Sequence, residues 1–318
     1  MSLHGRREGL PTRTVLIPVE HRPPRRGRRF GRRLIGLLAL IVLAIVAATV
    51  VAMLRHRPAN EAAPPRIKQA PTKPVAPPRT PAAVLLAQAQ QKAISRLAGL
   101  AVPVFCGGSN VRDVALTFDD GPGPYTSMVL GILRRHHAQA TFFLVGNRIR
   151  FWPTLPAAEA SLGAVGDHTW SHADLTRLPQ RAARREIERP LAAIGGRVRL
   201  FRTPYGREPA WLGRYLAARG MLEIRWTVDS NDYLPHTSVA KIARRIAPAL
   251  RPGAIVLLHD LHAATVNALP RLLALMRARH LQAVSVPELL RRDPPSYAQL
   301  MADSRGRGCV DLATARRE

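Results

Sequence analysis

Residues 113–122 read DVALTFDDGP and join a short apolar run to a charged turn. Val, Leu, Thr and Phe in such a run favour a buried strand. The run leads into Asp119 and Asp120, and the Gly-Pro pair that follows is typical of a tight turn. Taken alone, the two aspartates could be turn residues and nothing more, but similar arrangements recur along the chain.

Six further apolar runs alternate with segments of helical character. The runs are ATFFLV, LGAVGD, VRLF, EIRWTV, AIVLLH and LQAVSV, and helical segments include 126–137, 181–194, 208–219 and 238–250. Strands that alternate with helices predict parallel βα units and an α/β fold. About seven such units favour a (β/α) barrel over an open sheet, although composition does not separate the two.

Charged and imidazole side chains follow five of these runs. They are Asp119 and Asp120, His168 and His172, Arg202, Asp229 and Asp232, and His259. In a parallel barrel the carboxyl ends of the strands point to one face, and that face carries the chemistry. We therefore expect these side chains to meet in one site.

His168 and His172 lie four positions apart in the stretch AVGDHTWSHADL. That spacing would put both imidazoles on one face of a helical turn, close enough to hold one metal ion. In a chain with eleven histidines such a pair also arises by chance. It gains weight from the carboxylates expected at the same face.

The motifs together resemble the polysaccharide deacetylases, the NodB-homology domain of carbohydrate esterase family 4. The motifs are TFDDGP at 117–122, HTWSH at 168–172, RTPYG at 202–206, DSNDY at 229–233 and LLHD at 257–260, in the family's order. The resemblance covers roughly Val111 to Val286 and implies a distorted (β/α) barrel. It also implies metal-dependent removal of acetyl groups, commonly from N-acetylglucosamine in wall polymers or chitin.

The resemblance implies that Asp120, His168 and His172 hold a divalent metal. Two imidazoles and one carboxylate suit zinc and leave positions open for water and substrate. Cobalt or nickel could replace zinc. Such a metal would polarise the acetyl carbonyl and make a water molecule more acidic.

The catalytic roles are carried over from the same resemblance. Asp119 resembles the general base, and Arg202 the residue that pairs with it and orients it. The backbone N–H of Tyr205 matches the oxyanion donor. His259 resembles the general acid that protonates the departing amine, and Asp232 the carboxylate that keeps this imidazole charged.

The resemblance also places two residues at the walls of the site. Leu257 would line the small pocket for the acetyl methyl group. Tyr233 stands where the family usually has Trp, so that wall is altered. Thr203 replaces the more usual Pro, and Asp167 stands where Asn is common, in a role that we expect to be turn capping. None of these departures removes a catalytic group.

The N-terminal part of the chain predicts a membrane anchor. Residues 1–33 form a basic tail, and residues 34–54, LIGLLALIVLAIVAATVVAML, carry no charge. At about 1.5 Å per residue a helix of this length spans roughly 30 Å, the thickness of a hydrocarbon core. The arginines favour a cytoplasmic N-terminus, so the catalytic domain would lie outside the cytoplasmic membrane of a bacterium, attached by a single pass. A cleaved signal peptide is the alternative, although its apolar region is usually shorter.

The remaining organisation follows from composition. We expect a Pro/Ala-rich linker with a lead-in helix over 55–105, the catalytic domain over 106–310 and a tail over 311–318. The two cysteines, Cys106 and Cys309, bracket the catalytic domain. An oxidising compartment permits a disulfide between them, and two unrelated thiols are the alternative.

The formal charge of +27 favours anionic neighbours. Aromatic residues make up only 5% of the chain and belong largely to the motifs, which argues against a nucleic-acid-binding protein. The expected partners are an acetylated polysaccharide and the cytoplasmic membrane, with no obligate protein partner evident. Peptidoglycan is the favoured substrate, while exported poly-N-acetylglucosamine, chitin oligomers, O-acetylated xylan and a glycan-binding module without turnover remain alternatives.

Overall fold

The structure, a computed structural model, describes residues 80–195 and 198–303. The basic tail, the expected membrane span at 34–54, most of the linker, the C-terminal tail and Cys309 lie outside the described residues. Within the described ranges, no helix is both long enough and apolar enough to cross a membrane. Cys106 is buried, and its bond to Cys309 stays a prediction.

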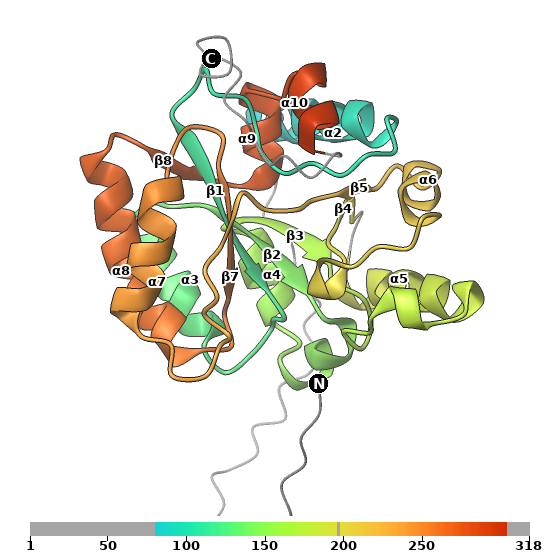
Figure 1. The fold of residues 1–318 in the computed structure, drawn as a ribbon, viewed down its shortest axis with the longest axis horizontal. Coiled ribbons are helices and arrows are strands. Elements are labelled where there is room, and N and C mark those ends of the chain that lie inside the picture. Colours follow the sequence, from blue (N-terminus) through green and yellow to red (C-terminus); the bar gives the residue numbers. More distant parts are fainter. Residues whose placement is uncertain (1–79, 196–197, 304–318) are drawn as a thin grey trace, which may run out of the picture. The chain divides into compact units, whose positions relative to one another are not determined.

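A single parallel sheet forms the centre of the fold (Figure 1). Its strands lie in the order β5-β4-β3-β2-β1-β7-β6, and β8 pairs with the start of β1. The strands are β1 (Asp113–Asp119), β2 (Ala140–Leu144), β3 (Gly163–Asp167), β4 (Leu200–Phe201), β5 (Leu222–Glu223), β6 (Val228–Asp229), β7 (Ile255–His259) and β8 (Gln282–Val284). The predicted alternation of parallel strands with helices is confirmed.

The sheet is a curled half-barrel, and its two end strands do not pair within the described residues. The run EIRWTV was expected as one strand, but the structure has two short strands there. β5 pairs with β4, and the chain then crosses to β7 and pairs with it at β6. Two bridges cross the gap between them: Val104 pairs with Ile224, and Cys106 pairs with Ala254. The segment before the first strand therefore fills part of the place of a closing strand.

Helices cover the outer face of the sheet. They are α3 (Thr126–Arg135), α4 (Leu155–Ala160), α5 (Gln180–Ile194), α6 (Leu212–Ala217), α7 (Val239–Ile246) and α8 (Ala263–Ala278), with α9 (Val286–Arg292) and α10 (Tyr297–Asp303) at the C-terminal end of the described chain. Short 3-10 turns lie at Gly146–Phe151 (η1), Leu175–Arg177 (η2), Pro204–Gly206 (η3) and Ala247–Ala249 (η4). Figure 1 shows α3, α7 and α8 on one flank of the sheet and α5 and α6 on the other. The four helical segments expected from the sequence all form, with bounds that differ by a few residues.

Helix α2 (Pro81–Ala98) packs at the amino-terminal ends of the strands. Thr80 accepts a hydrogen bond from the backbone N–H of Ala83, and Pro81 begins the helix, which are two common start signals. The last turn buries Ile94 and Leu97 against α9 and the first residues of β4, β5 and β7. The lead-in helix therefore belongs to the folded unit, and the carboxyl ends of the strands are left for the site.

Alternation along β1 and β7 separates the core from the site. The large apolar cluster under the outer helices takes Val114, Leu116 and Phe118 from β1. The residues between them face the other side of the sheet, where Asp119 is the register partner of His259 on β7. Because register partners point to the same face, the acid and the imidazole come to adjacent strand ends.

Candidate active site

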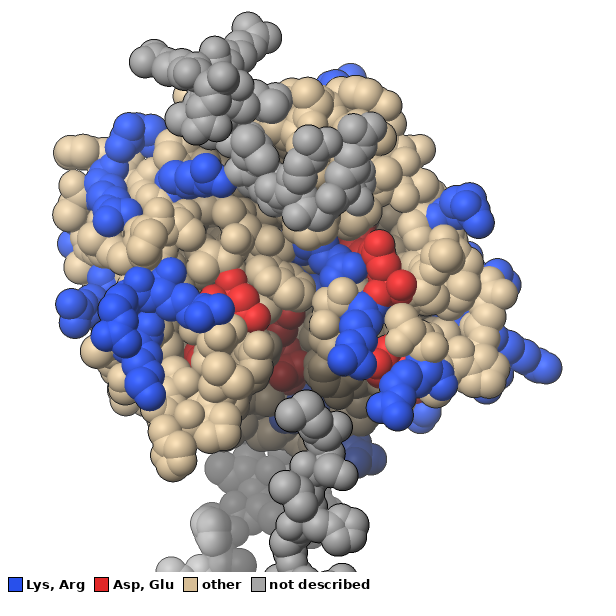
Figure 2. All heavy atoms as spheres, in the orientation of Figure 1, with Lys and Arg blue, Asp and Glu red and all other residues tan. Residues whose placement is uncertain are grey.

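The residues expected to form the site lie together at the carboxyl ends of the strands, around a cleft of about 370 Å³. The cleft is lined by Asp119, Asp120, His168, His172, Thr203, Tyr205, Trp226, Asp229, Tyr233, Leu257 and His259. Figure 2 shows acidic atoms recessed in the middle of the visible face, with basic side chains around them. Arg202 and Asp232 do not line the cleft but hold residues that do.

Asp120, His168 and His172 come together at the cleft, with one ligand atom from each within 4.8 Å of the others. Asp120 Oδ1 lies 3.5 Å from His168 Nε2 and 3.2 Å from His172 Nε2. This oxygen is buried and has no hydrogen-bond partner in the described part of the chain. A buried carboxylate oxygen that faces two imidazole nitrogens fits a divalent cation, and this donor set suits zinc.

Each of these histidines has a hydrogen-bond partner on the far side of its ring, and the partner of His168 sets its tautomer. His168 Nδ1 lies 2.8 Å from the backbone oxygen of Arg202, and His172 Nδ1 lies 3.2 Å from the hydroxyl of Tyr205. Because a carbonyl oxygen only accepts, Nδ1 of His168 carries the proton and Nε2 keeps its lone pair for a metal. Burial lowers the pKa of His168 to about 3 against the opposing charge of Asp120, so its imidazole is neutral.

The two histidines lie in an irregular loop, and the expectation of a helical turn is wrong. No helix covers residues 168–174, and η2 begins only at Leu175. Thr169 and His172 have φ angles of 67° and 60°, which a right-handed helix does not contain. Asp167 Oδ1 accepts from the backbone N–H of Thr169 at 2.8 Å, a bond that fits the turn-capping role expected for it. The loop still brings the two rings within 4.9 Å between centroids.

Asp119 is held by a buried guanidinium. Arg202 donates from Nη1 to Asp119 Oδ1 at 2.7 Å and to Thr117 Oγ1 at 2.7 Å. It also donates to two backbone carbonyls that follow β5, so its orientation is fixed. Burial raises the pKa of Asp119, although the charge of Arg202 opposes the change. A carboxylate whose pKa is raised toward neutrality is a better general base at neutral pH.

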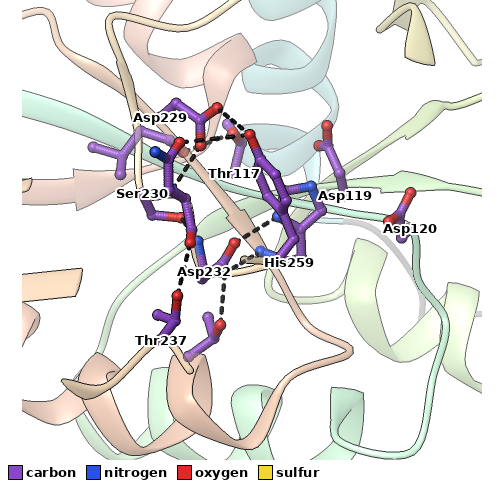
Figure 3. Close-up of polar contacts among 12 residues, drawn as sticks. Thr117, Asp119, Asp120, Asp229, Ser230, Asp232, Thr237 and His259 are labelled. Carbon is purple, nitrogen blue, oxygen red and sulfur yellow. Dashed lines mark hydrogen bonds and ion pairs between the residues drawn. The ribbon is translucent and has the colours of Figure 1, made fainter. Parts of the chain in front are cut away.

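His259 is held by Asp232. Figure 3 shows this pair, with Asp119 and Asp120 nearby. Asp232 Oδ1 lies 2.7 Å from His259 Nδ1, and Oδ2 accepts from the backbone N–H of His259 at 2.7 Å. Burial alone would lower the pKa of His259, but the hydrogen bond and charge of Asp232 outweigh it and raise the pKa to about 9. The imidazole is therefore protonated at neutral pH, as a general acid must be.

The three residues expected to contact substrate line the cleft. Tyr205 is 62% exposed, and its φ of 59° is uncommon for a residue with a Cβ atom. Leu257 is 4% exposed and lies on β7 next to His259. Tyr233 is 47% exposed, and its ring centroid lies 5.3 Å from that of His259.

The sequence did not indicate the backbone conformation around the cleft. Positive φ angles occur at Asp120, Thr169, His172, Tyr205 and Asn231, between 53° and 71°. Such conformations persist only where the surrounding structure holds them, and they gather at functional sites. Asp, Asn and His are the residue types that most often adopt them, so composition gave no signal at Thr169 and Tyr205.

Three supporting side chains were also missed. Trp226 was expected within a strand but lies between β5 and β6 and lines the cleft. Thr117 links Arg202 to the backbone of β7 through its own bond to the carbonyl of Val256. Thr265 donates to Asp232 Oδ2 at 2.6 Å. A threonine inside a strand or at a helix start carries no sign of such a role.

The family model described as polysaccharide deacetylase matches residues 107–223. A chitooligosaccharide deacetylase from Rhizobium leguminosarum bv. trifolii is 37% identical over 166 residues, which cover 50% of this chain and 76% of that protein. The chain belongs to the polysaccharide deacetylase family. The resemblance drawn from the five motifs is thus confirmed. Two of the motifs, at 229–233 and 257–260, lie beyond the matched range, and the structure brings their residues to the same cleft.

Two further members of the family show how far the similarity extends. The peptidoglycan-N-acetylglucosamine deacetylase PgdA of Listeria monocytogenes serotype 1/2a is 31% identical over 184 residues, which cover 56% of this chain and 39% of that protein. The structure of a family 4 carbohydrate esterase from Streptomyces lividans, solved with acetate, has a TM-score of 0.53 and 32% identity, and the match covers 60% of this chain and 98% of that one. The similarity therefore concerns the deacetylase domain.

Proposed function

We propose that this protein is a metal-dependent hydrolase that removes acetyl groups from N-acetylglucosamine units of a cell-wall or exported polysaccharide, with peptidoglycan favoured. One observation carries the proposal: a metal-binding triad, an arginine-held acid and a protonated imidazole meet in a single cleft. Relatives named for chitooligosaccharides and for peptidoglycan support this substrate class.

The triad Asp120, His168 and His172 would hold the cation, with zinc favoured and cobalt or nickel as substitutes. When bound, the cation supplies Lewis acidity, which polarises a carbonyl and makes a water molecule more acidic. Asp119 then takes a proton from the attacking water, because its pKa is raised by burial and its carboxylate is oriented by Arg202.

The leaving group is handled from the other side of the cleft. As water adds to the carbonyl carbon, negative charge develops on the carbonyl oxygen, and the backbone N–H of Tyr205 would stabilise it. An amine departs poorly unless it is protonated, so His259 gives its proton to the nitrogen as the C–N bond breaks. Asp232 keeps His259 charged until that step. The products are acetate and a free amine on the glycan.

The activity is tested by incubating the protein with peptidoglycan, chitin oligomers and poly-N-acetylglucosamine. Acetate release and the loss of acetyl mass from the glycan, followed by mass spectrometry, are expected on at least one of them. A glycan-binding module without turnover would bind the same polymers and release no acetate. O-acetylated xylan is a fourth substrate, and acetate release from it alone would move the proposal to ester substrates.

We also infer that residues 34–54 anchor the chain in the cytoplasmic membrane of a bacterium, with the catalytic domain outside. The support is the uncharged apolar run, the arginines before it and the proline-rich segment after it. Fractionation of cells that express the full chain tests this, with the protein expected in the membrane fraction. A mature protein in the soluble fraction that lacks residues 34–54 would instead show a cleaved signal peptide.

A further inference from the structure

A second hollow adjoins the catalytic cleft at His172 and Tyr205, which line both. Its volume is about 510 Å³, and its other walls include Arg177, Arg207 and Asp174. A polysaccharide chain with one sugar unit in the cleft must continue out of the cleft on at least one side. Because the two hollows share walls, the neighbouring sugar unit can lie in the second one.

The charge of the second hollow differs from that of the cleft. Arg207 Nη1 donates to Asp174 Oδ2 at 3.0 Å, which uses one of the five N–H donors of that guanidinium. Arg177 is exposed and forms no ion pair with any residue that the structure describes. Two arginines and one aspartate leave a net charge of plus one, with guanidinium donors free to bind an anion.

The catalytic cleft, by contrast, is lined by carboxylates. Asp119, Asp120 and Asp229 all border it. In the proposed enzyme the bound cation and the charged His259 offset these carboxylates, so the cleft carries no excess positive charge, whereas the second hollow does. An acidic group on the next sugar unit is therefore favoured beside the arginines of the second hollow, while the neutral acetamido group lies in the cleft.

We propose that Arg177 and Arg207 form a subsite for a carboxylate on the sugar unit next to the one that is deacetylated. This inference rests on the proposed function and narrows its substrate to carboxylate-bearing glycans, such as strands that contain muramic acid. The planar guanidinium matches a carboxylate with two parallel charge-assisted hydrogen bonds, which are stronger than those it makes to the neutral hydroxyls of a sugar. A chitin oligomer, which carries no acid, would place a neutral sugar in the second hollow and gain no ion pair with these arginines.

The test compares wild type with Arg177→Gln, Arg207→Gln and the double variant on two substrates of equal length. One is a chitin oligomer, and the other alternates N-acetylglucosamine with N-acetylmuramic acid whose lactyl carboxylate is free. Each substitution should raise KM for the acidic oligomer by about two- to fivefold, as expected for an exposed ion pair, and leave kcat unchanged. KM for chitin should stay the same. The effect should shrink as salt is added.

Arg244→Gln is the matched control, since it removes one positive charge from an exposed position on α7. It should change KM for neither oligomer. Equal losses on both oligomers, or no loss on any of the substrates, would overturn the subsite. A third substrate that keeps its peptide stem separates the two carboxylate sources: an arginine effect that appears only with the stem assigns the site to a stem carboxylate.

Calorimetric binding of the same oligomers keeps the subsite and the proposed function apart. In one outcome, no substrate loses acetate, while wild type still binds the acidic oligomer more tightly than chitin and the double variant does not. That result would support the subsite and contradict the proposed deacetylase activity. If acetate is released while binding and KM show no preference for the acidic oligomer, the activity stands and the subsite is wrong.

Discussion

Arg202 and Asp119 form a buried ion pair, with 2.7 Å between Nη1 and Oδ1, at the end of β1. Neither side chain reaches solvent to a significant extent. The same nitrogen also donates to Thr117 of the same strand, so one guanidinium holds two side chains of β1. Because the second oxygen of Asp119 lies 3.7 Å from His168 Nε2, the pair leaves one carboxylate oxygen directed toward the metal-binding triad.

Asp119→Asn should separate metal binding from catalysis. An amide oxygen can still accept from Arg202, and the triad is untouched, so metal content should be unchanged. The variant cannot take a proton, and kcat/KM should fall about 10²–10⁴-fold, the usual contribution of a general base. Acetate release and metal analysis on the same sample measure both. A metal-loaded variant with a near-normal rate would assign the base role to another carboxylate.

His172→Ala should abolish metal binding and activity while the fold is kept. The side chain is partly exposed on an irregular loop and contacts Asp120 and Tyr205, not the apolar core. Metal analysis and circular dichroism check the two expectations, with His136→Ala as a control at a histidine away from the triad. Full activity of His172→Ala after chelation and zinc addition would contradict the metal assignment.

Asp232→Asn should move the alkaline limit of activity. The pKa of His259 is about 9, so the protonated general acid is present at neutral pH and is lost as the pH rises through that value. Without the charge of Asp232 the pKa falls toward the ordinary value of about 6.5, and the falling limb of kcat/KM should shift to lower pH. A pH profile of both proteins measures the shift. An alkaline limb at the same pH in both would show that another group donates the proton.

Much of the fold could be predicted because side-chain alternation fixes it. β1 places Phe118 in the core and Asp119 in the site because adjacent residues of a strand face opposite sides. The shared direction of parallel strands likewise predicted that the polar residues that follow five strands would lie on one face. It could not predict that EIRWTV splits into β5 and β6, because pairing with β4 and β7, not local propensity, decides where the strand is interrupted.

The residues predicted for the site lie together around one cleft, but the sequence did not predict the conformation of their backbone. His168 and His172 meet through a loop with left-handed residues, whereas their spacing pointed to a helix. The position of Trp226 could not be predicted either, since an aromatic residue in an apolar run gives no sign that it faces a cleft. These features depend on contacts between distant parts of the chain, which a local pattern does not contain.

Glu159 and Asp260 are two buried carboxyls that the proposed chemistry does not use. Neither oxygen of Glu159 has a hydrogen-bond partner within the described residues, while Asp260 accepts from Thr126 through one oxygen only. Burial raises the pKa of Glu159 well above its ordinary range, and the nearby charge of Asp260 adds to the effect. Burial likewise raises the pKa of Asp260 to about 7.

These shifts predict that the protein becomes less stable as the pH rises toward neutrality. A carboxyl whose pKa is higher in the folded state binds its proton more tightly there, so its stabilisation is complete below the unfolded pKa and is lost as the pH rises through the folded one. Glu159→Gln cannot titrate and places no charge beside Asp260, so its melting temperature should fall less than that of wild type between about pH 5 and about pH 8.

Glu188→Gln is the control with the opposite sign. Hydrogen bonds from Tyr215 and Arg219 hold the pKa of Glu188 below its ordinary value, so the stabilisation from this exposed group is present above the unfolded pKa and is lost only in acid. The substitution should therefore leave the change between about pH 5 and about pH 8 as in wild type. Thermal unfolding of the three proteins across this range decides the matter. If Glu159→Gln loses as much stability as wild type on going to the higher pH, the buried glutamate is already ionised in the folded protein, and a partner for its charge must be sought around α4.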